Sequence, residues 1–304
     1  MVDEPVGHTP VMPREVCELL DVRESDTVVD ATVGLAGHAG LFAEKLGKEG
    51  TLIGLDVDPA NLEIARRRMA GAACRVELLH ANFGEIASAL SSVGVGGVDV
   101  LLADLGVSST QLDDAARGFS FQRDGPLDMR MDPRLTVTAT DLVNRLKERE
   151  LGDLLYYNAQ EMASRKIARR VCHVRREGRI TTTGRLAEIV AAALRVDPSS
   201  RKAKIHPATR TFLALRMAVN DESPRLLQLL AGAPGILNPE GRIGVIAFHS
   251  VEDKPVKTDF RQRKADGIYR IVTKKPLVAS PEERRSNPRS RSAKFRVAVR
   301  LPEE

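Results

Sequence analysis

Residues 27–56, TVVDATVGLAGHAGLFAEKLGKEGTLIGLD, decide the fold of this chain. Two short apolar runs, at residues 27–31 and 51–56, enclose a glycine-rich turn and a helical pattern. The same alternation continues, with strand patterns at residues 75–80 and 98–104 and helical patterns at 59–70 and 83–90. Continuous apolar strands that alternate with helices are typical of a parallel sheet covered on both faces. We therefore predict a doubly wound α/β sheet.

The pattern changes after this region. Helical patterns follow one another without a strand between them, at residues 139–155, 159–176, 184–194 and 207–219. Strand patterns then return at residues 242–248, 269–273 and 294–300. This order predicts a sheet domain made of residues 1–111 and 211–304, with an all-helical subdomain, residues 112–210, inserted into it.

A long polar segment, residues 104–132, lies at the first junction and reads DLGVSSTQLDDAARGFSFQRDGPLDMRMD. Its length and its lack of a period are typical of a functional or a disordered loop. Large apolar side chains recur through it as if they had pockets to fill, namely Phe119, Phe121, Leu127, Met129 and Met131. We therefore expect an ordered loop at the end of a buried strand, where α/β folds place their ligands.

Composition and charge limit the class of protein. The chain has 304 residues, of which 42% are hydrophobic, and no apolar run is long enough to span a bilayer. Its first residues lack the basic and apolar regions of a signal peptide, so we expect a cytoplasmic protein with no membrane partner. The three cysteines are far apart and make no CxxC pair, which signals neither a disulfide framework nor a zinc site.

The charge is unevenly distributed along the chain. Residues 1–129 carry a net charge of −11, residues 130–210 carry +9 and residues 254–300 carry +11. Two basic blocks beside an acidic ligand-binding region indicate a polyanionic partner. Solvated helix faces are the alternative interpretation of either block alone.

The first strand runs into a glycine-rich turn. Gly34, Gly37 and Gly40 let the backbone come close to a ligand at a helix N-terminus. The turn differs from the GxGxxG dinucleotide fingerprint because Ala36 and Ala39 interrupt it, which argues against a nicotinamide dehydrogenase. A tight strand-to-helix turn without a ligand is the alternative.

The next three strand patterns also end in polar or aromatic residues. Asp56 is placed to accept both hydroxyls of a ribose, Asn82 and Phe83 to hold an adenine, and Asp104 to meet a charged tail. One strand-end Asp is often only a helix N-cap, but four such features in chain order describe one ligand. S-adenosylmethionine fits it better than NAD does, because no pyrophosphate site is present. This predicts a class I (Rossmann-like) S-adenosylmethionine-dependent methyltransferase.

Longer motifs extend from one end of the chain to the other. They are HTPV at residues 8–11, GH at 37–38, DVDP at 56–59, the segment 104–133, KIHPATRTF at 204–212, ALR at 214–216, VNDE at 219–222, FHSVED at 248–253 and NPRSRSA at 287–293. On these motifs the chain resembles the bacterial 16S rRNA (cytosine-N4)-methyltransferase family, known as RsmH or MraW. The resemblance implies methylation of the exocyclic N4 of a cytidine in the decoding centre (P site) of 16S rRNA, with the small ribosomal subunit as partner. It leaves open whether the protein is a monomer or a homodimer.

The resemblance also implies the residues that contact the cofactor. Carried over by position, they are Ala36, Gly37, His38, Asp56, Phe83, Asp104 and Gln111. The family usually has Arg and Gly where this chain has Leu35 and Ala36, so the backbone contact there is expected to shift. The family's Tyr-Gly-Glu-Glu motif is matched only weakly in this chain, by the sequence YNAQE at residues 157–161.

The chemistry requires a group that accepts a proton from the cytosine amine, whose lone pair is delocalised into the ring. We expect Asp104 and the hydroxyls of Ser108 and Ser109 to accept from it, with His249 as a second acceptor or proton shuttle. The alternatives are turn-forming hydroxyls for the two serines and a buried structural role for His249. A cationic methyl donor needs no metal, and no metal-binding cluster is evident in the sequence.

RNA is expected to bind the helical block and the basic C-terminal stretch. Arg165, Lys166, Arg169 and Arg170 follow helical spacing and are predicted to contact phosphates, which makes binding strongly salt-dependent. Because the chain has no Trp and only three Tyr, we expect base stacking on Phe119 or Phe121. The target base must leave its stack to be methylated.

Two other functions remain compatible with these patterns. One is a methyltransferase that acts on DNA or on a protein, since basic blocks do not distinguish DNA from RNA. The other is a non-enzymatic ribosome-assembly factor that has kept the cofactor fold. The presence of Gly37, Asp56, Phe83 and Asp104 argues against the second, because an inactive site has no need of all four.

Overall fold

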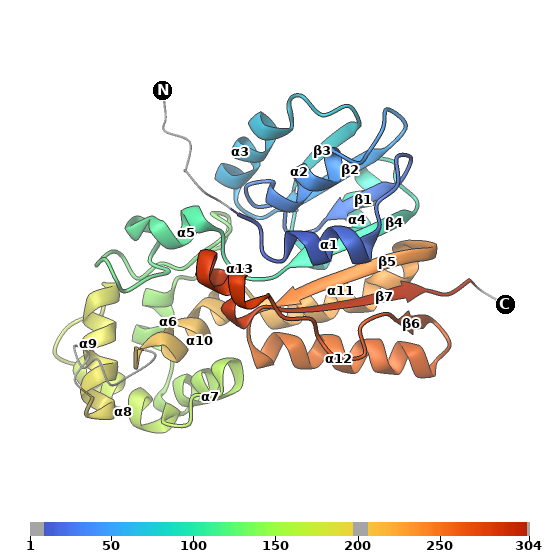
Figure 1. The fold of residues 1–304 in the computed structure, drawn as a ribbon. Helices are drawn as coiled ribbons and strands as arrows, with labels where there is room; N and C mark the ends of the chain where they lie inside the picture. Colours follow the sequence, from blue (N-terminus) through green and yellow to red (C-terminus); the bar gives the residue numbers. More distant parts are fainter. Residues whose placement is uncertain (1–8, 197–205, 303–304) are drawn as a thin grey trace. The chain divides into compact units, whose positions relative to one another are not determined.

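The computed structural model describes residues 9–196 and 206–302, so His8, Lys204 and Ile205 of the motifs lie outside the described residues. The chain divides into two compact units (Figure 1). We call the first, Met1–Gly106 with Pro224–Glu304, the sheet unit, and the second, Val107–Ser223, the helical unit. The second is thus an insertion into the first.

One sheet of seven strands forms the centre of the sheet unit. Its strands are β1 Thr27–Asp30, β2 Thr51–Asp56, β3 Arg75–His80, β4 Val98–Asp104, β5 Leu237–Ala247, β6 Tyr269–Ile271 and β7 Lys294–Arg300. They are ordered β3-β2-β1-β4-β5-β7-β6. Strand β7 runs opposite to the other six, so it pairs antiparallel with both β5 and β6. The predicted Rossmann-like sheet with an inserted helical region is confirmed. Strand β5 begins earlier than expected, where Leu237 pairs with Val98.

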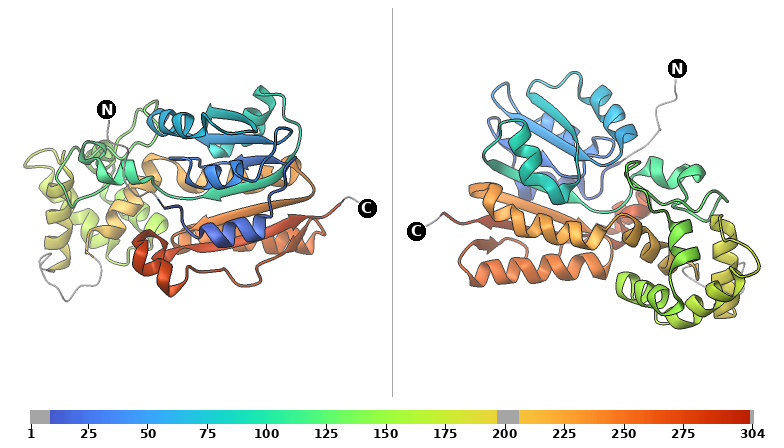
Figure 2. Two further views of the ribbon diagram at one scale, coloured as in Figure 1. Left: turned by 45° about the horizontal axis from the view of Figure 1, so that its top comes forward. Right: turned by 180° about the vertical axis from the view of Figure 1, so that it is seen from behind.

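Both faces of the sheet are buried beneath helices (Figure 2). Successive side chains of a strand point to opposite faces, so Val28 and Val29 of β1 enter two different apolar clusters. One cluster includes α1 Pro13–Leu20, α2 Gly37–Ala43 and α3 Pro59–Met69. The other includes α4 Ile86–Ser92, α11 Glu222–Ile236 and α12 Ser250–Ala265. This double covering leaves the ends of the strands, rather than their faces, available for a ligand.

Short elements connect these layers. They are η1 Phe83–Glu85 after β3, and α13 Pro281–Ser286 with η3 Pro288–Ser292 before β7. The last two carry the NPRSRSA motif, in which Ser290 is fully buried. Asn287 donates a side-chain hydrogen bond to the carbonyl of Thr9 (3.2 Å), so this motif holds the described start of the chain.

The described part of the helical unit up to residue 219 forms seven helical segments. They are α5 Ser109–Asp113, η2 Ala115–Arg117, α6 Ala139–Arg145, α7 Glu148–Ala159, α8 Ser164–Val174, α9 Thr183–Leu194 and α10 Thr209–Val219. The single helix expected over residues 139–155 is wrong, because the chain turns at Leu146 and Lys147 and a second helix begins there. Helix α10 lies within this unit because it packs on α7, where Asn158 donates to the carbonyl of Ala214 (3.1 Å). The unit therefore begins before residue 112 and ends beyond residue 210, the boundaries expected from sequence.

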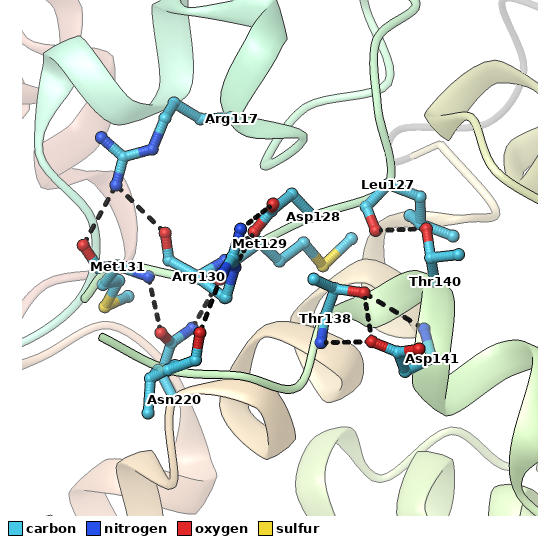
Figure 3. Close-up of polar contacts among 11 residues, drawn as sticks. Arg117, Leu127, Asp128, Met129, Arg130, Met131, Thr138, Thr140, Asp141 and Asn220 are labelled. Atoms are coloured by element: carbon cyan, nitrogen blue, oxygen red, sulfur yellow. Dashed lines mark hydrogen bonds and ion pairs between the residues drawn. The ribbon is translucent and has the colours of Figure 1, made fainter. Parts of the chain in front are cut away.

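The loop after η2 is held by the VNDE motif (Figure 3). Asn220 accepts a hydrogen bond from the N–H of Met131 (2.7 Å) and donates one to the carbonyl of Met129 (2.8 Å). Arg117 donates to the carbonyls of Arg130 and Met131 at 3.0 and 3.1 Å. Leu127, Met129 and Met131 are buried, as their recurrence suggested. The polar segment is thus an ordered loop.

Candidate active site

The turn after β1 has an unusual backbone conformation. Gly34 and Ala36 both adopt the left-handed region, with φ of 51° and 61°. A side chain there costs about 1–2 kcal/mol, which explains why glycine suits the position that Ala36 occupies. Arg68 of α3 holds the turn from outside, because its guanidinium donates to the carbonyl of Leu35 (2.8 Å). Gly37 and His38 then begin α2.

Asp56, at the end of β2, is tied to this turn. Its carboxylate accepts hydrogen bonds from the N–H of Gly34 (2.9 Å), the N–H of Asp58 (2.7 Å) and the amide of Asn61 (3.2 Å). Burial raises the pKa of Asp56 to about 7, against the effect of these hydrogen bonds. A carboxylate offers about four acceptor positions, so capacity remains for a ribose hydroxyl.

Phe83 follows the next strand. It begins η1 and is half-buried, packed against the apolar cluster of the α4 face. The amide oxygen of Asn82 accepts the N–H of Gly84 (2.9 Å) and so caps this short helix. Asn82 therefore has a local structural role, while the ring of Phe83 is partly accessible at the same edge of the sheet.

His38 and Asp104 meet where β1 and β4 end. Nε2 of His38 lies 3.5 Å from a carboxylate oxygen of Asp104, and the N–H of Asp104 donates to the hydroxyl of Thr32 (2.7 Å). The N–H of Thr32 in turn donates to buried Asp30 (3.1 Å). Within residues 9–196 and 206–302, both ring nitrogens of His38 and one oxygen of Asp104 are buried without a hydrogen-bond partner. Buried polar atoms rarely lack partners, so this cluster fits a ligand that supplies them.

The buried carboxyl group of Asp30 makes stability depend on pH. Burial raises its pKa to about 6, although His38 and the hydrogen bonds from Thr32 oppose this. An unfolded Asp titrates near pH ~4, so the folded chain holds this proton more tightly. The free energy of unfolding is therefore expected to fall as the pH rises from about 4 to about 6. Asp30→Asn should flatten the dependence of Tm on pH across this window, whereas exposed Asp266→Asn should not. An unchanged slope in Asp30→Asn contradicts the prediction.

His249 lies just after β5, the strand that pairs with β4. It precedes α12, and its Nε2 lies 3.0 Å from a carboxylate oxygen of buried Glu252. The other oxygen of Glu252 accepts the N–H of Phe248 (2.9 Å). Strands β4 and β5 pair Asp104 with Ile246, so His249 and Asp104 leave the same edge of the sheet. A buried carboxylate that holds an imidazole is an arrangement suited to proton transfer.

Ser108, Ser109 and Gln111 belong to the helical unit. Ser108 and Gln111 cap α5 reciprocally, because the side chain of each accepts the backbone N–H of the other, at 3.0 and 3.4 Å. The hydroxyl of Ser108 also lies 2.9 Å from that of Thr110. Ser109 differs from them, because its hydroxyl is buried and has no hydrogen-bond partner among the described residues. Ser108 and Gln111 therefore have a structural role as the cap of α5, whereas no such local role accounts for the hydroxyl of Ser109.

Neither Phe119 nor Phe121, which were expected to stack on RNA, is exposed on the surface. Phe119 is buried, with the guanidinium of Arg117 5.9 Å from the centre of its ring, so the prediction for Phe119 is wrong. The ring of Phe121 lies 4.3 Å from that of His206 and 4.9 Å from that of Phe212. The apolar pattern that suggested these residues therefore reflects packing within the helical unit.

The four predicted phosphate-binding residues share the exposed side of α8. Arg165 donates to the carbonyl of Arg149 (2.8 Å) and pairs with Asp153, and Arg169 lies 3.5 Å from Glu148. Lys166 and Arg170 are exposed, and no ion pair of theirs is recorded among the described residues. The opposite side of α8 is buried, and the four cations lie on its solvent-exposed side.

Sequence reasoning missed several residues of this region. Asp30 and Thr32 support Asp104, Asn61 supports Asp56, and Glu252 supports His249. Asp30 carried a signal, since it ends a strand as Asp56 and Asp104 do. Glu252 stood within FHSVED, but nothing in the sequence indicated that it faces His249.

The described residues offer neither a metal-binding cluster nor a membrane-spanning helix. Between residues 9–196 and 206–302, no group of three or more His, Cys, Asp or Glu side chains is arranged to hold a metal ion. Over the same residues, none of the helices combines the length and the apolar character that crossing a membrane requires.

Comparisons with known proteins extend over the whole chain. The model of the MraW methylase family matches residues 5–301. A ribosomal RNA small subunit methyltransferase H of Koribacter versatilis is 46% identical, over 98% of this chain and 95% of that protein. Its counterpart in Geobacter sulfurreducens is also 46% identical, over 97% and 99%. Among solved structures, an rRNA methylase from Streptococcus thermophilus is 11% identical with a TM-score of 0.43, over 99% of each chain.

Proposed function

Because the chain belongs to the MraW methylase family and is a ribosomal RNA small subunit methyltransferase, we propose that it methylates the exocyclic N4 of a cytidine in the decoding centre of 16S rRNA. The methyl donor is S-adenosylmethionine. One observation carries the assignment of the cofactor site: among the described residues, buried atoms of His38 and Asp104 lack hydrogen-bond partners beside a left-handed turn at the carboxyl edge of a Rossmann-like sheet.

The cofactor is assigned to the residues along this edge. The backbone of Ala36 and Gly37 allows close approach, and Asp56 has acceptor capacity for a ribose. The ring of Phe83 offers a face for adenine. His38 and Asp104 supply buried polar atoms for the amino-acid part. Gln111 is included as a further contact on the family resemblance. When bound, S-adenosylmethionine supplies an electrophilic methyl group.

The protein's own part in the reaction is to orient the cytosine amine and to accept its proton. Asp104 and Ser109 are the acceptors we favour, since each has a buried oxygen without a hydrogen-bond partner among the described residues. Ser108 contributes through its cap of α5, which sets the position of Ser109. His249, whose Nε2 lies 3.0 Å from a carboxylate oxygen of Glu252, is the residue proposed to relay the proton. General acid–base catalysis of this kind contributes about 10²- to 10⁴-fold in rate.

The helical unit is the proposed RNA-binding part. Its α8 presents Arg165, Lys166, Arg169 and Arg170 on one exposed side, and the helix contains no acidic residue. Cations arranged in this way bind a phosphate backbone regardless of sequence, which positions the RNA. The substrate partner is the small ribosomal subunit or its 16S rRNA.

The test is complementation in a bacterium that lacks its own member of the family. Mass spectrometry of 16S rRNA nucleosides is expected to show N4-methylcytidine only when this chain is expressed. DNA nucleosides from the same cells serve as the control for substrate class. N4-methylcytidine in DNA but not in 16S rRNA would indicate the other nucleic acid. Restored subunit assembly without the methylated nucleoside would indicate an assembly factor.

A further inference from the structure

Three large apolar side chains are exposed within seven residues of the helical unit. Tyr156 and Tyr157 at the end of α7 are 44% and 70% exposed, and Met162 in the turn before α8 is 78% exposed. The two rings pack edge to face, with centres 5.3 Å apart. We call these three residues the tyrosine platform. Apolar groups gathered at one exposed place commonly mark a binding surface.

The two rings lie outside the buried side of α7. The buried side of α7 is formed by Leu151, Leu155 and Ala159, which follow one another at four-residue spacing. Tyr156 and Tyr157 lie off this line. Two of the chain's three tyrosines are thus displayed together, while Tyr269 is buried in the sheet unit.

An ion pair lies one helical turn before the two rings. The guanidinium of Arg165 lies across Gly152, where a Cβ atom would be 2.7 Å from it, and pairs with Asp153. Tyr156 and Tyr157 come four residues after Gly152 and Asp153, so each lies one helical turn further along the same side of α7. The chain then passes through Met162 directly into α8, with its exposed cations.

We propose that the tyrosine platform stacks on unpaired bases of single-stranded rRNA whose phosphates contact α8. Aromatic surfaces beside cations are how proteins hold single strands without reading their sequence. The exposed cations of α8, which follows the platform directly in the chain, favour this partner over an apolar protein surface. The inference rests on the proposed function, and it replaces Phe119 as the stacking residue.

The experiment measures binding of a short, unstructured, fluorescent RNA to the full chain by anisotropy. Tyr156→Ala/Tyr157→Ala is expected to lose about tenfold or more in affinity, while Tyr156→Phe/Tyr157→Phe binds like the parent because its rings remain. Affinity for an RNA duplex should not change, since duplex bases are already stacked. Leu227→Ala, at an exposed apolar residue of α11, is the matched control for loss of surface area.

Salt dependence separates stacking from charge. Lys166→Ala/Arg170→Ala should reduce the slope of log affinity against log salt by about 1.4, because each phosphate contact on a single strand contributes about 0.7. The tyrosine-to-alanine variant should keep the parent's slope.

Three outcomes would overturn the inference. They are parental affinity in the alanine variant, equal losses in the alanine and phenylalanine variants, and a loss seen only with assembled subunits, which would indicate a ribosomal protein partner. Methylation of small subunits by the parent is measured in parallel. If the parent methylates and the alanine variant binds RNA normally, this inference fails alone. If the parent does not methylate, the proposed function fails first.

Discussion

Replacing Asp104 with asparagine is expected to lower the turnover of methyl transfer by about 10²- to 10⁴-fold. The amide is nearly the same size as the carboxylate, and the backbone bond from residue 104 to Thr32 does not depend on the side chain. What the substitution removes is the negative charge beside His38 and the oxygen that can take a proton. Single-turnover rates at saturating RNA and cofactor measure this loss, and calorimetry measures cofactor affinity separately.

The matched control for Asp104→Asn is Asp266→Asn, since Asp266 is an exposed residue at the end of α12. If Asp104→Asn keeps wild-type turnover but binds the cofactor more weakly, Asp104 contributes to cofactor binding and not to proton transfer. His249→Ala extends the test to the second acceptor. If both variants keep wild-type turnover, the assignment of proton transfer to this edge of the sheet is wrong.

Asn220→Ala is expected to destabilise the helical unit by about 3 kcal/mol. The substitution leaves the N–H of Met131 and the carbonyl of Met129 buried without partners, and each such group costs about 1–3 kcal/mol. Met129 also holds a left-handed backbone, with φ of 67°, so the loop depends on this support (Figure 3). Hydrogen exchange of the Met131 amide and thermal unfolding of the full chain measure the effect.

Asn158→Ala is the comparison for this prediction. Asn158 makes one recorded side-chain hydrogen bond, to the carbonyl of Ala214, and is only half-buried, so a loss of about 1 kcal/mol is expected. Equal protection of the Met131 amide in Asn220→Ala and the parent would show that the loop is held by other contacts, such as those of Arg117.

The strands were predictable because their signal is local. Residues 51–56, 75–80 and 98–104 match β2, β3 and β4, since an apolar run covered on both faces is visible in a few consecutive residues. The break between α6 and α7 was missed because neither Pro nor Gly marks it. It is marked by the cap of α7, in which the carboxylate of Glu150 accepts the N–H of Lys147.

The candidate site was predictable only where one residue suffices as a signal. Asp56 and Asp104 stood out because each follows a buried strand. Their supports did not stand out, since Thr32 reaches Asp104 through the pairing of β1 with β4, across seventy-two positions of sequence. The link between Asn220 and the loop spans a similar separation.

By itself, the sequence determined the Rossmann-like sheet, the helical insert, the family and the acidic strand ends. Only the tertiary structure decided which aromatic residues are displayed. Phe119 and Tyr157 look equally suited to bind a base in the sequence, yet Phe119 is 7% exposed and Tyr157 is 70% exposed. The reason is physical: periodicity records which residues avoid water, whereas exposure depends on which other segments arrive to cover them.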